Sequence, residues 1–423
     1  MKLKLQNRNT ALIFLLAFII FEVLIYFFLE LLGYSGFTAI PFARLGIIVF
    51  TFFFLIKHIL LLKIPIRLNT KASIHSVFFG AWFVFTIIEL FIGVVNKNPV
   101  LYIITDFIYI FFGLLLFLTF KQKRIKQLIS IEEKTFLKYS YYIAAIGYVL
   151  FFLGIKMPAT LLIILVILTY IYVLDKKYFR VLILFTPYIL EISRSNRTHL
   201  IVFLMMIFIL FLRKVRERFN VIDLAFVFIL TLGSIIFFLQ DILNFIFVFV
   251  DANTNLGFRI NQLIRVLENG IDYSNPYFTS ISQRVLEIQA VINYWTSDLY
   301  SFIFGSGLGG VLDGSEFTDT SVTNSALLGK EKIHNIHVLP FAFIFRYGLF
   351  GITLLCLLAM SFYNSFVVIL NNSKNKELIF WNLFFLLWIV FSLPAASFIW
   401  TSPIFWMSCA YIGNLKQTRN TSQ

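Results

Sequence analysis

The sequence predicts an all-α polytopic membrane protein with about twelve transmembrane helices and one large periplasmic loop that contains amphipathic helices. Of the 423 residues, 60% are hydrophobic and only 13% are charged, which excludes an ordinary soluble domain. Apolar runs recur from Ala11 to Tyr411, and most of them have about twenty residues, the length at which a helix crosses the hydrocarbon core. None of these runs alternates between apolar and polar residues as a barrel strand does, so the spans are predicted to be helical.

The apolar runs set the expected positions of the spans. They fall at 10–32, 39–62, 73–95, 99–120, 139–155, 158–175, 179–192, 198–212, 221–241, 348–370, 378–394 and 397–414. The chain is therefore expected to have an N-terminal bundle of about nine helices at 1–241 and a large extracytoplasmic loop at 242–347. The remaining spans and a cytoplasmic tail follow at 348–423.

Basic residues mark every second turn between the spans. If the N-terminus is cytoplasmic, the inner turns carry Lys57, Lys63, Arg67, Lys71, Lys121, Lys123, Arg124, Lys126, Lys176, Lys177, Arg180, Arg213, Lys214, Arg216, Arg218, Lys374, Lys376, Lys416 and Arg419. Outside the long loop, the outer turns carry only Lys97, Lys156, Arg194 and Arg197. This bias predicts that both termini are cytoplasmic and that the long loop is outside. It also explains the formal charge of +14 without a nucleic-acid partner.

Five ionisable residues fall in the outer halves of the predicted spans, where a charge normally faces a partner or a water-filled cavity. They are Glu30, Arg44, Glu89, Asp106 and Glu191. Each of these residues, considered alone, is explained by a structural pair with an opposite charge. Considered together, the five residues favour a polar cavity that opens outward.

Arg194 and Arg197 lie at the outer mouth of the predicted bundle, just before a span, where positive residues oppose the insertion rule. The phosphate of a membrane-anchored ligand would compensate them, because guanidinium binds phosphate in a bidentate manner and stays charged. A salt bridge to Glu191 together with lipid headgroups would compensate them equally well.

The long loop is predicted to be partly folded. The segments GFRINQLIRVLENG and FTSISQRVLEIQAVINYW have apolar residues at helical spacing and are expected to form amphipathic helices. They carry Arg259, Arg265 and Arg284, for each of which a solvated helix face is one interpretation and a binding role another. A flexible Gly-rich turn, FGSGLGG, follows; it lacks the Lys and Ser/Thr of a phosphate-binding loop.

A short acidic stretch after the Gly-rich turn is not predicted to bind a metal. Asp313, Glu316 and Asp319 lack the rest of a calcium-loop pattern. The sequence therefore predicts neither a metal site nor a cofactor.

The order of features in this region resembles the signature region of the bacterial O-antigen polymerase and O-antigen ligase superfamily. The features are Arg284 on an amphipathic helix, the turn with Gly305, Gly307 and Gly309, the His334-Asn335 element, the Gly348-x-x-Gly351 pair that opens a span and, upstream, Arg197 in SNRTHL. His337 has the family's usual spacing to Gly348 but is followed by Val338 rather than Asn. His334 is followed by Asn335 but lies farther away, so the choice of histidine stays open.

The resemblance implies a metal-independent glycosyltransferase that needs no cofactor. Such an enzyme transfers a glycan from undecaprenyl diphosphate to an acceptor hydroxyl at the outer face of the bacterial cytoplasmic (inner) membrane. The leaving diphosphate gains charge in the transition state, so fixed guanidinium groups lower the barrier. The expected diphosphate-binding residues are Arg197 and Arg284, supported by Arg194 and Arg265.

The expected catalytic residues are histidines of the loop together with Arg284. His334 is the first candidate for a general base, His337 is the second, and Glu191 or Asn335 is an alternative base or orienting group. A polymerase of O-antigen, capsule or exopolysaccharide is favoured over a ligase. A ligase would pass finished glycan to lipid A-core, which completes lipopolysaccharide, or to protein. A flippase of lipid-linked oligosaccharides is the alternative of another class. The expected partners are the lipid-linked glycan, membrane lipid and a candidate chain-length regulator protein.

Overall fold

The computed structural model describes residues 10–32, 45–53, 73–121, 133–192, 197–216, 238–248, 250, 254–272, 278–313, 332–371 and 375–415. This part of the chain is mostly helical. Within the described residues, four helices are long and apolar enough to cross a membrane by length and composition, namely Ile74–Val95, Val100–Leu118, Thr198–Arg216 and Leu339–Asn371. The chain is thus a helical membrane protein.

The elements follow one another in the order that the apolar runs predict. They are α1 Thr10–Leu31, α3 Ile74–Val95, α4 Val100–Phe120, α6 Glu133–Phe152, α7 Ala159–Leu174, α8 Tyr178–Ile192, α9 Arg197–Arg216, α11 Leu239–Val248, α12 Asn255–Asn269, α13 Thr279–Trp295, α14 Leu299–Phe304, β1 Leu312–Asp313, β2 Lys332–Ile333, α15 Leu339–Asn371, α16 Lys376–Ser392, α17 Ser397–Thr401 and α18 Pro403–Leu415. Six of the predicted spans agree with helices to within about two residues at each end. These helices are α1, α3, α4, α7, α8 and α16.

Two predicted spans differ from the structure in ways that the backbone explains. The span predicted at 397–414 is interrupted by Ser402, which has extended backbone angles (φ −98°, ψ 109°), so that Pro403 begins a new helix. The span predicted to open at Gly348 begins earlier, because α15 already starts at Leu339. Most of the predicted span at 39–62 and residues 221–237 lie outside the described part of the chain.

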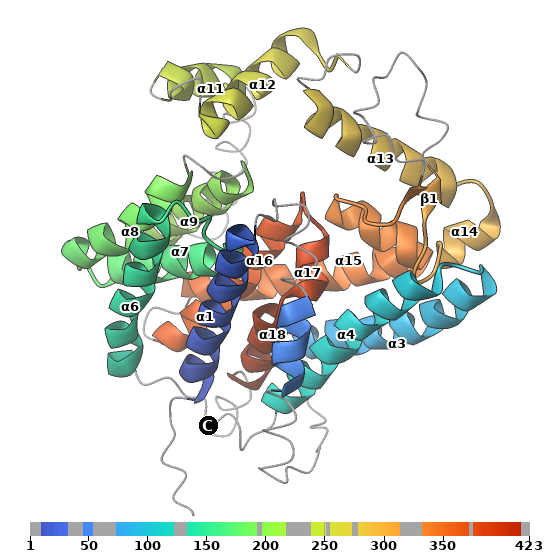
Figure 1. Cartoon of the computed structure of the whole chain (residues 1–423), viewed down its shortest axis with the longest axis horizontal. Helices are drawn as coiled ribbons and strands as arrows, with labels where there is room; N and C mark the ends of the chain where they lie inside the picture. The colour runs from blue at the N-terminus through green and yellow to red at the C-terminus, as the bar shows by residue number, and fades with distance from the viewer. Residues whose placement is uncertain are drawn as a thin grey trace, which may run out of the picture.

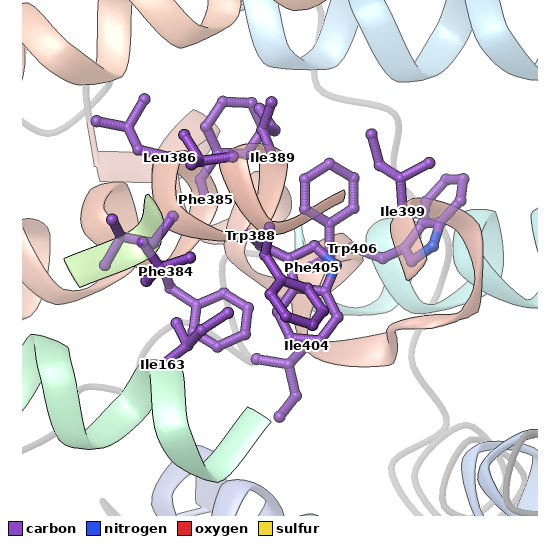
Figure 2. Packing of buried hydrophobic residues seen from close by; sticks show 14 of the residues in the cluster. Ile163, Phe384, Phe385, Leu386, Trp388, Ile389, Ile399, Ile404, Phe405 and Trp406 are labelled. Atoms are coloured by element: carbon purple, nitrogen blue, oxygen red, sulfur yellow. The ribbon is translucent and has the colours of Figure 1, made fainter. Parts of the chain in front are cut away.

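Two helices, α7 and α16, form the centre of the bundle. Every residue from Thr160 to Tyr172 and every residue from Ile379 to Ser392 is buried. Helix α16 packs against α7, α9, α15 and α18, and Figure 2 shows the resulting core, with side chains from α7, α16, α17 and α18 meeting between the helices. A helix that is apolar on all sides is stable only where protein or lipid surrounds it. In this molecule the neighbours are other helices of the same chain.

Helices at the edge of the bundle present large apolar side chains outward. Phe91 of α3, Leu101 of α4, Leu204 of α9 and Met360 of α15 are all exposed. An exposed apolar surface spread over several helices marks contact with a partner or a membrane. On helices of this length, lipid is the natural neighbour.

The helices of the predicted loop gather at one end of the molecule. Helices α11 and α12 lie at the top of the molecule and α13 at its upper right (Figure 1), while α14 packs against α15. The prediction that two helices form in this region is confirmed by α12 and α13. The buried positions of α13, among them Ser282, Leu286 and Val291, recur at helical spacing on one face.

Helix α15 bends sharply at Gly348. This residue has φ 53° and ψ −128°, a combination that only glycine adopts without strain. Three residues later, Gly351 lets the second half of the helix lie directly against the backbone of Phe343. The Gly-x-x-Gly pair therefore forms a kink inside α15, and the segment before the kink faces the Gly-rich turn.

Candidate functional site

The Gly-rich turn at 305–310 is a tight junction between α14 and three helices of the bundle. Gly305, Gly307 and Gly309 all have positive φ, at 70°, 76° and 73°. A Cβ atom on these glycines would lie 2.6, 2.5 and 2.6 Å from the backbone nitrogens of, in order, Gly348, Gly93 and Ile103. The expectation of a flexible turn is therefore wrong, because the turn is packed against α3, α4 and α15.

The backbone groups of this turn are bonded within the protein. The N–H groups of Ser306, Gly307 and Leu308 donate to the carbonyl oxygens of, in order, Phe345, Arg346 and Glu89, at 2.7, 3.1 and 2.9 Å. The side-chain amide of Asn98 donates to the carbonyl oxygens of Ser306 and Leu308, both at 2.8 Å. A phosphate-binding loop keeps its N–H groups for the ligand. This turn uses these three to hold the fold together.

Replacing Gly305 by Ala is expected to reduce the folded protein in membranes. Backbone strain at positive φ costs about 1–3 kcal/mol, and the new methyl group would also meet the backbone of Gly348. Gly154→Ala isolates the strain, since φ there is 74° and its Cβ would meet nothing within 4 Å. Gly80→Ala is the second control, because Gly80 is helical with open space around it. Thermal unfolding in detergent should rank Gly80→Ala as the most stable variant and Gly305→Ala as the least; equal stability would contradict the tight junction.

A buried ion pair lies next to the Gly-rich turn. Asp106 of α4 is 6% exposed, and its Oδ1 lies 3.1 Å from Nη2 of Arg346 in α15. The N–H of Gly309 donates to Oδ2 of Asp106 at 3.0 Å, and Nε2 of His334 lies 3.4 Å from Oδ1. The guanidinium of Arg346 also lies over the ring of Trp400, 4.6 Å from its centroid. Asp106 thus connects α4, α15, the turn and the segment that follows β2.

The first candidate base, His334, belongs to this buried network. Its Nδ1 lies 2.9 Å from the carbonyl oxygen of Gly310, which can only accept, so Nδ1 donates. The ring stacks on Tyr102 at 4.2 Å between centroids, and the side chain is 11% exposed. Because Nε2 faces Asp106, both ring nitrogens of His334 are engaged by the protein.

His337 has a different environment, although it lies only three residues further along the chain. Its Nδ1 lies 2.8 and 3.1 Å from the two oxygens of the Glu287 carboxylate. A carboxylate accepts hydrogen bonds, so Nδ1 donates and, in the neutral ring, Nε2 keeps its lone pair. The His337 side chain is 40% exposed, and among the described residues Nε2 has no hydrogen-bond partner. His337 can therefore accept a proton at Nε2.

Glu287 is fixed by further contacts from two sides. Its side chain is fully buried, its Oε2 accepts the backbone N–H of His337 at 3.1 Å, and its Oε1 accepts from Nε2 of Gln283 at 3.3 Å. Helix α13, which carries Glu287, packs against α15. A buried carboxylate that holds both the ring and the backbone of a histidine leaves the imidazole little freedom to rotate.

Two arginines interact electrostatically, and one of them is near Glu287 in the sequence of α13. Arg284 is on α13, one turn before Glu287, and Arg259 is on α12. Burial lowers the pKa of Arg284, the nearby Glu287 raises it, and the positive charge of Arg259 lowers it again. Two guanidinium groups that repel each other are stabilised when an anion binds between them. A phosphate group bound near both side chains would relieve this repulsion.

The other predicted site residues are placed as follows. Arg265 is on the exposed face of α12, and Asn335 is exposed between β2 and α15. Arg197 is the first residue of α9, and its side chain is outside the described part of the structure, as is all of Arg194. The structure thus brings Arg284 and His337 together through Glu287, whereas His334 is in a separate network.

The carboxylates predicted in outer halves of spans have individual environments. Asp106 pairs with Arg346, and Oε1 of Glu191 accepts the backbone N–H of Met157 at 3.2 Å. Glu89 is buried, and its carboxyl group has no hydrogen-bond partner among the described residues. The side chain of Glu30 and all of Arg44 lie outside the described part. Asp106 and Glu191 therefore hold helices and loops in place.

Three residues of these networks, Glu287, Arg259 and Arg346, were not predicted as site residues from the sequence. Glu287 shares a helix face with Gln283 and Arg284 at the spacing at which side chains meet, which was a usable signal. Arg259 was recognised as part of an amphipathic helix but was not assigned to the site. Arg346 had no local signal, because its partner Asp106 is on a distant helix.

Among the described residues, no group of three or more His, Cys, Asp and Glu side chains is placed to hold a metal ion. Comparison with protein-family models, with curated protein sequences and with solved structures finds no match for the chain.

Proposed function

We propose that this protein is a polysaccharide polymerase that transfers a glycan from a polyprenyl diphosphate carrier to a sugar hydroxyl at the outer face of a bacterial cytoplasmic membrane. One observation carries the proposal. The buried Glu287 carboxylate orients the ring of His337 and lies one helical turn after Arg284, whose charge interacts with those of Glu287 and Arg259. These are the groups that proton removal from a hydroxyl and departure of a diphosphate require.

His337 takes the role of the base or orienting group in this proposal. Its Nε2 accepts the proton of the attacking hydroxyl while Glu287 stabilises the imidazolium that forms. The geometry favours His337 over His334, because Nδ1 of His334 already donates to Gly310 and its Nε2 faces Asp106.

The arginines serve the leaving group. The acceptor oxygen forms a bond to the anomeric carbon of the donor sugar while the bond from that carbon to the diphosphate oxygen breaks. The electron pair of the broken bond stays on the diphosphate, so its negative charge grows. Arg284 and Arg259 counter that growing charge more strongly in the transition state than in the ground state, which lowers the barrier. Arg197, Arg194 and Arg265 remain proposed as further diphosphate contacts.

The proposed topology puts this cluster outside the cell. The apolar runs favour about twelve spans, and the Lys and Arg bias favours cytoplasmic termini and an extracytoplasmic loop at 242–347. In Figure 1, α11, α12 and α13 lie at the top of the molecule, above α16, α17 and α18, which supports an extracytoplasmic position for the loop helices.

Replacing Arg284 by Ala is expected to abolish long glycan while the protein is still inserted at normal levels, because the leaving diphosphate loses a fixed positive partner. Arg284→Lys should restore only part of the activity, since an ammonium group does not bind phosphate in a bidentate manner. Lys156→Ala is the matched control, as it removes an exposed basic residue from a turn predicted to face the same side. The measurement is the length ladder of the glycan on a gel, and a normal ladder in Arg284→Ala would overturn the proposal.

A deletion strain separates the polymerase from its alternatives. Loss of a polymerase leaves single repeat units attached to their acceptor outside the cell. Loss of a ligase leaves finished chains on the lipid carrier, and loss of a flippase traps single repeats on the inner leaflet. We expect the first of these patterns.

A further inference from the structure

The segment at 334–338 connects two networks that lie on different helices. At its beginning, His334 contacts Asp106 of α4 and the carbonyl oxygen of Gly310. Further along, His337 contacts Glu287 of α13 through its ring and its backbone N–H. The direction in which the segment leaves the Gly-rich turn therefore determines where His337 meets α13.

The anchor at the beginning of the segment is rigid. Asp106 is held by the N–H of Gly309 and by Arg346, and the turn that carries Gly310 is packed against three helices. Stacking of the His334 ring on Tyr102 fixes the plane of the ring as well. At the other end, the carbonyl oxygen of His337 accepts the N–H of Ala396 at 2.7 Å. The segment is thus tied to α4, to α13 and to the turn before α17.

Such ties matter because a base acts only at a defined distance from its proton. A displacement of about 1 Å costs about 10²-fold in rate, even when it originates away from the chemistry. Groups that act in catalysis are therefore supported by residues whose own positions are fixed by packing and hydrogen bonds.

We propose that His334 is a positioning residue, whose buried contacts with Asp106 and Gly310 hold the segment at 334–338 so that Nε2 of His337 faces the reacting hydroxyl. This inference rests on the proposed function, in which His337 is the group that meets the hydroxyl. It assigns the two histidines different tasks: His337 exchanges the proton, and His334 acts only through the backbone between them.

The test compares three replacements of His334 in the full-length protein in membrane vesicles, with a polyprenyl-diphosphate repeat unit as donor. Asn can supply the hydrogen bond of Nδ1 to Gly310, and Gln can supply a donor at the position of Nε2 towards Asp106. Neither can take up a proton near neutral pH. His334→Ala removes both contacts. His75→Gln is a matched control, because His75 is a buried histidine whose Nε2 contacts Ser365 instead.

A positioning role predicts that kcat falls about 10²-fold in His334→Ala, while the KM for the donor changes little. His334→Asn or His334→Gln should recover at least about ten-fold of that loss, because either keeps one anchoring contact. His75→Gln should keep the wild-type rate. All rates are expressed per folded protein, measured by size-exclusion elution and thermal unfolding in detergent.

Two results would overturn the inference. If Asn and Gln are as inactive as Ala in folded protein, then His334 itself exchanges the proton. If His334→Ala keeps the wild-type rate, then the segment does not need its anchor. Other results would contradict the proposed function itself. These are a wild-type protein that makes no polymer from the donor, or a His337→Ala variant that makes polymer at the wild-type rate.

Discussion

Glu287→Gln is expected to lower the rate of glycan chain growth by about 10²–10⁴-fold without lowering the amount of protein in the membrane. Glutamine has nearly the same shape, so the fold should persist. Its amide can donate to Nδ1 of His337, which favours the tautomer with hydrogen on Nε2. The nitrogen proposed to accept the proton would then already carry one. The measurement is the initial rate of chain growth in vesicles from a lipid-linked repeat unit.

Glu268→Gln is the matched control for this change. Glu268 is an exposed carboxylate on α12 whose Oε1 accepts from Gln240 at 3.3 Å, away from both histidines. Its replacement should leave the rate unchanged. A wild-type rate in Glu287→Gln would mean that His337 needs no carboxylate partner, and the proposed role of the pair would be lost.

Arg346→Met is expected to cause the largest loss of stability among the changes considered. Removing one partner of a buried ion pair costs about 3–5 kcal/mol, because the other charge stays buried without compensation. Arg346 is 5% exposed, and its guanidinium also packs on Trp400, so the loss of packing adds to the loss of charge. The protein should unfold at a lower temperature in detergent and accumulate less in membranes.

The double variant Asp106→Asn with Arg346→Met tests the cause of that loss. It removes both charges, while the asparagine oxygen can still accept the N–H of Gly309. If charge burial dominates, the double variant is more stable than Arg346→Met alone. If the two losses simply add, the ion pair does not explain the effect.

The positions of the helices could be predicted because they depend on local features. Runs of apolar residues set the ends of α3 and α4, and helical spacing of apolar residues marked α12 and α13 as separate elements. Even the short helices α7 and α16 were expected, although the structure shows that they are surrounded by protein on all sides.

The start of α15 could not be predicted, because its sequence before the kink contains Arg346. A charged residue next to Tyr347 and Gly348 indicates the end of a loop when only neighbouring residues are considered. In the structure the charge is neutralised by Asp106, which is far away in the sequence. A partner of that kind allows a helix to extend through a residue that would otherwise stay in water.

The choice between the two histidines depended on contacts of the same long-range kind. His334 and His337 look equivalent in the sequence, since His334 is followed by Asn335 and His337 has the expected spacing to Gly348. Gly310 and Asp106 occupy the two ring nitrogens of His334, whereas Glu287 occupies only Nδ1 of His337. Neither pairing follows from periodicity or from motif order.

The most direct test of the central claim is chain growth by the purified full-length protein in vesicles supplied with only a polyprenyl-diphosphate repeat unit. We predict that the wild-type protein makes a ladder of longer glycans and that His337→Ala makes none, although it is folded. A ladder from His337→Ala equal to that of the wild-type protein, or no ladder from the wild-type protein, would contradict the claim.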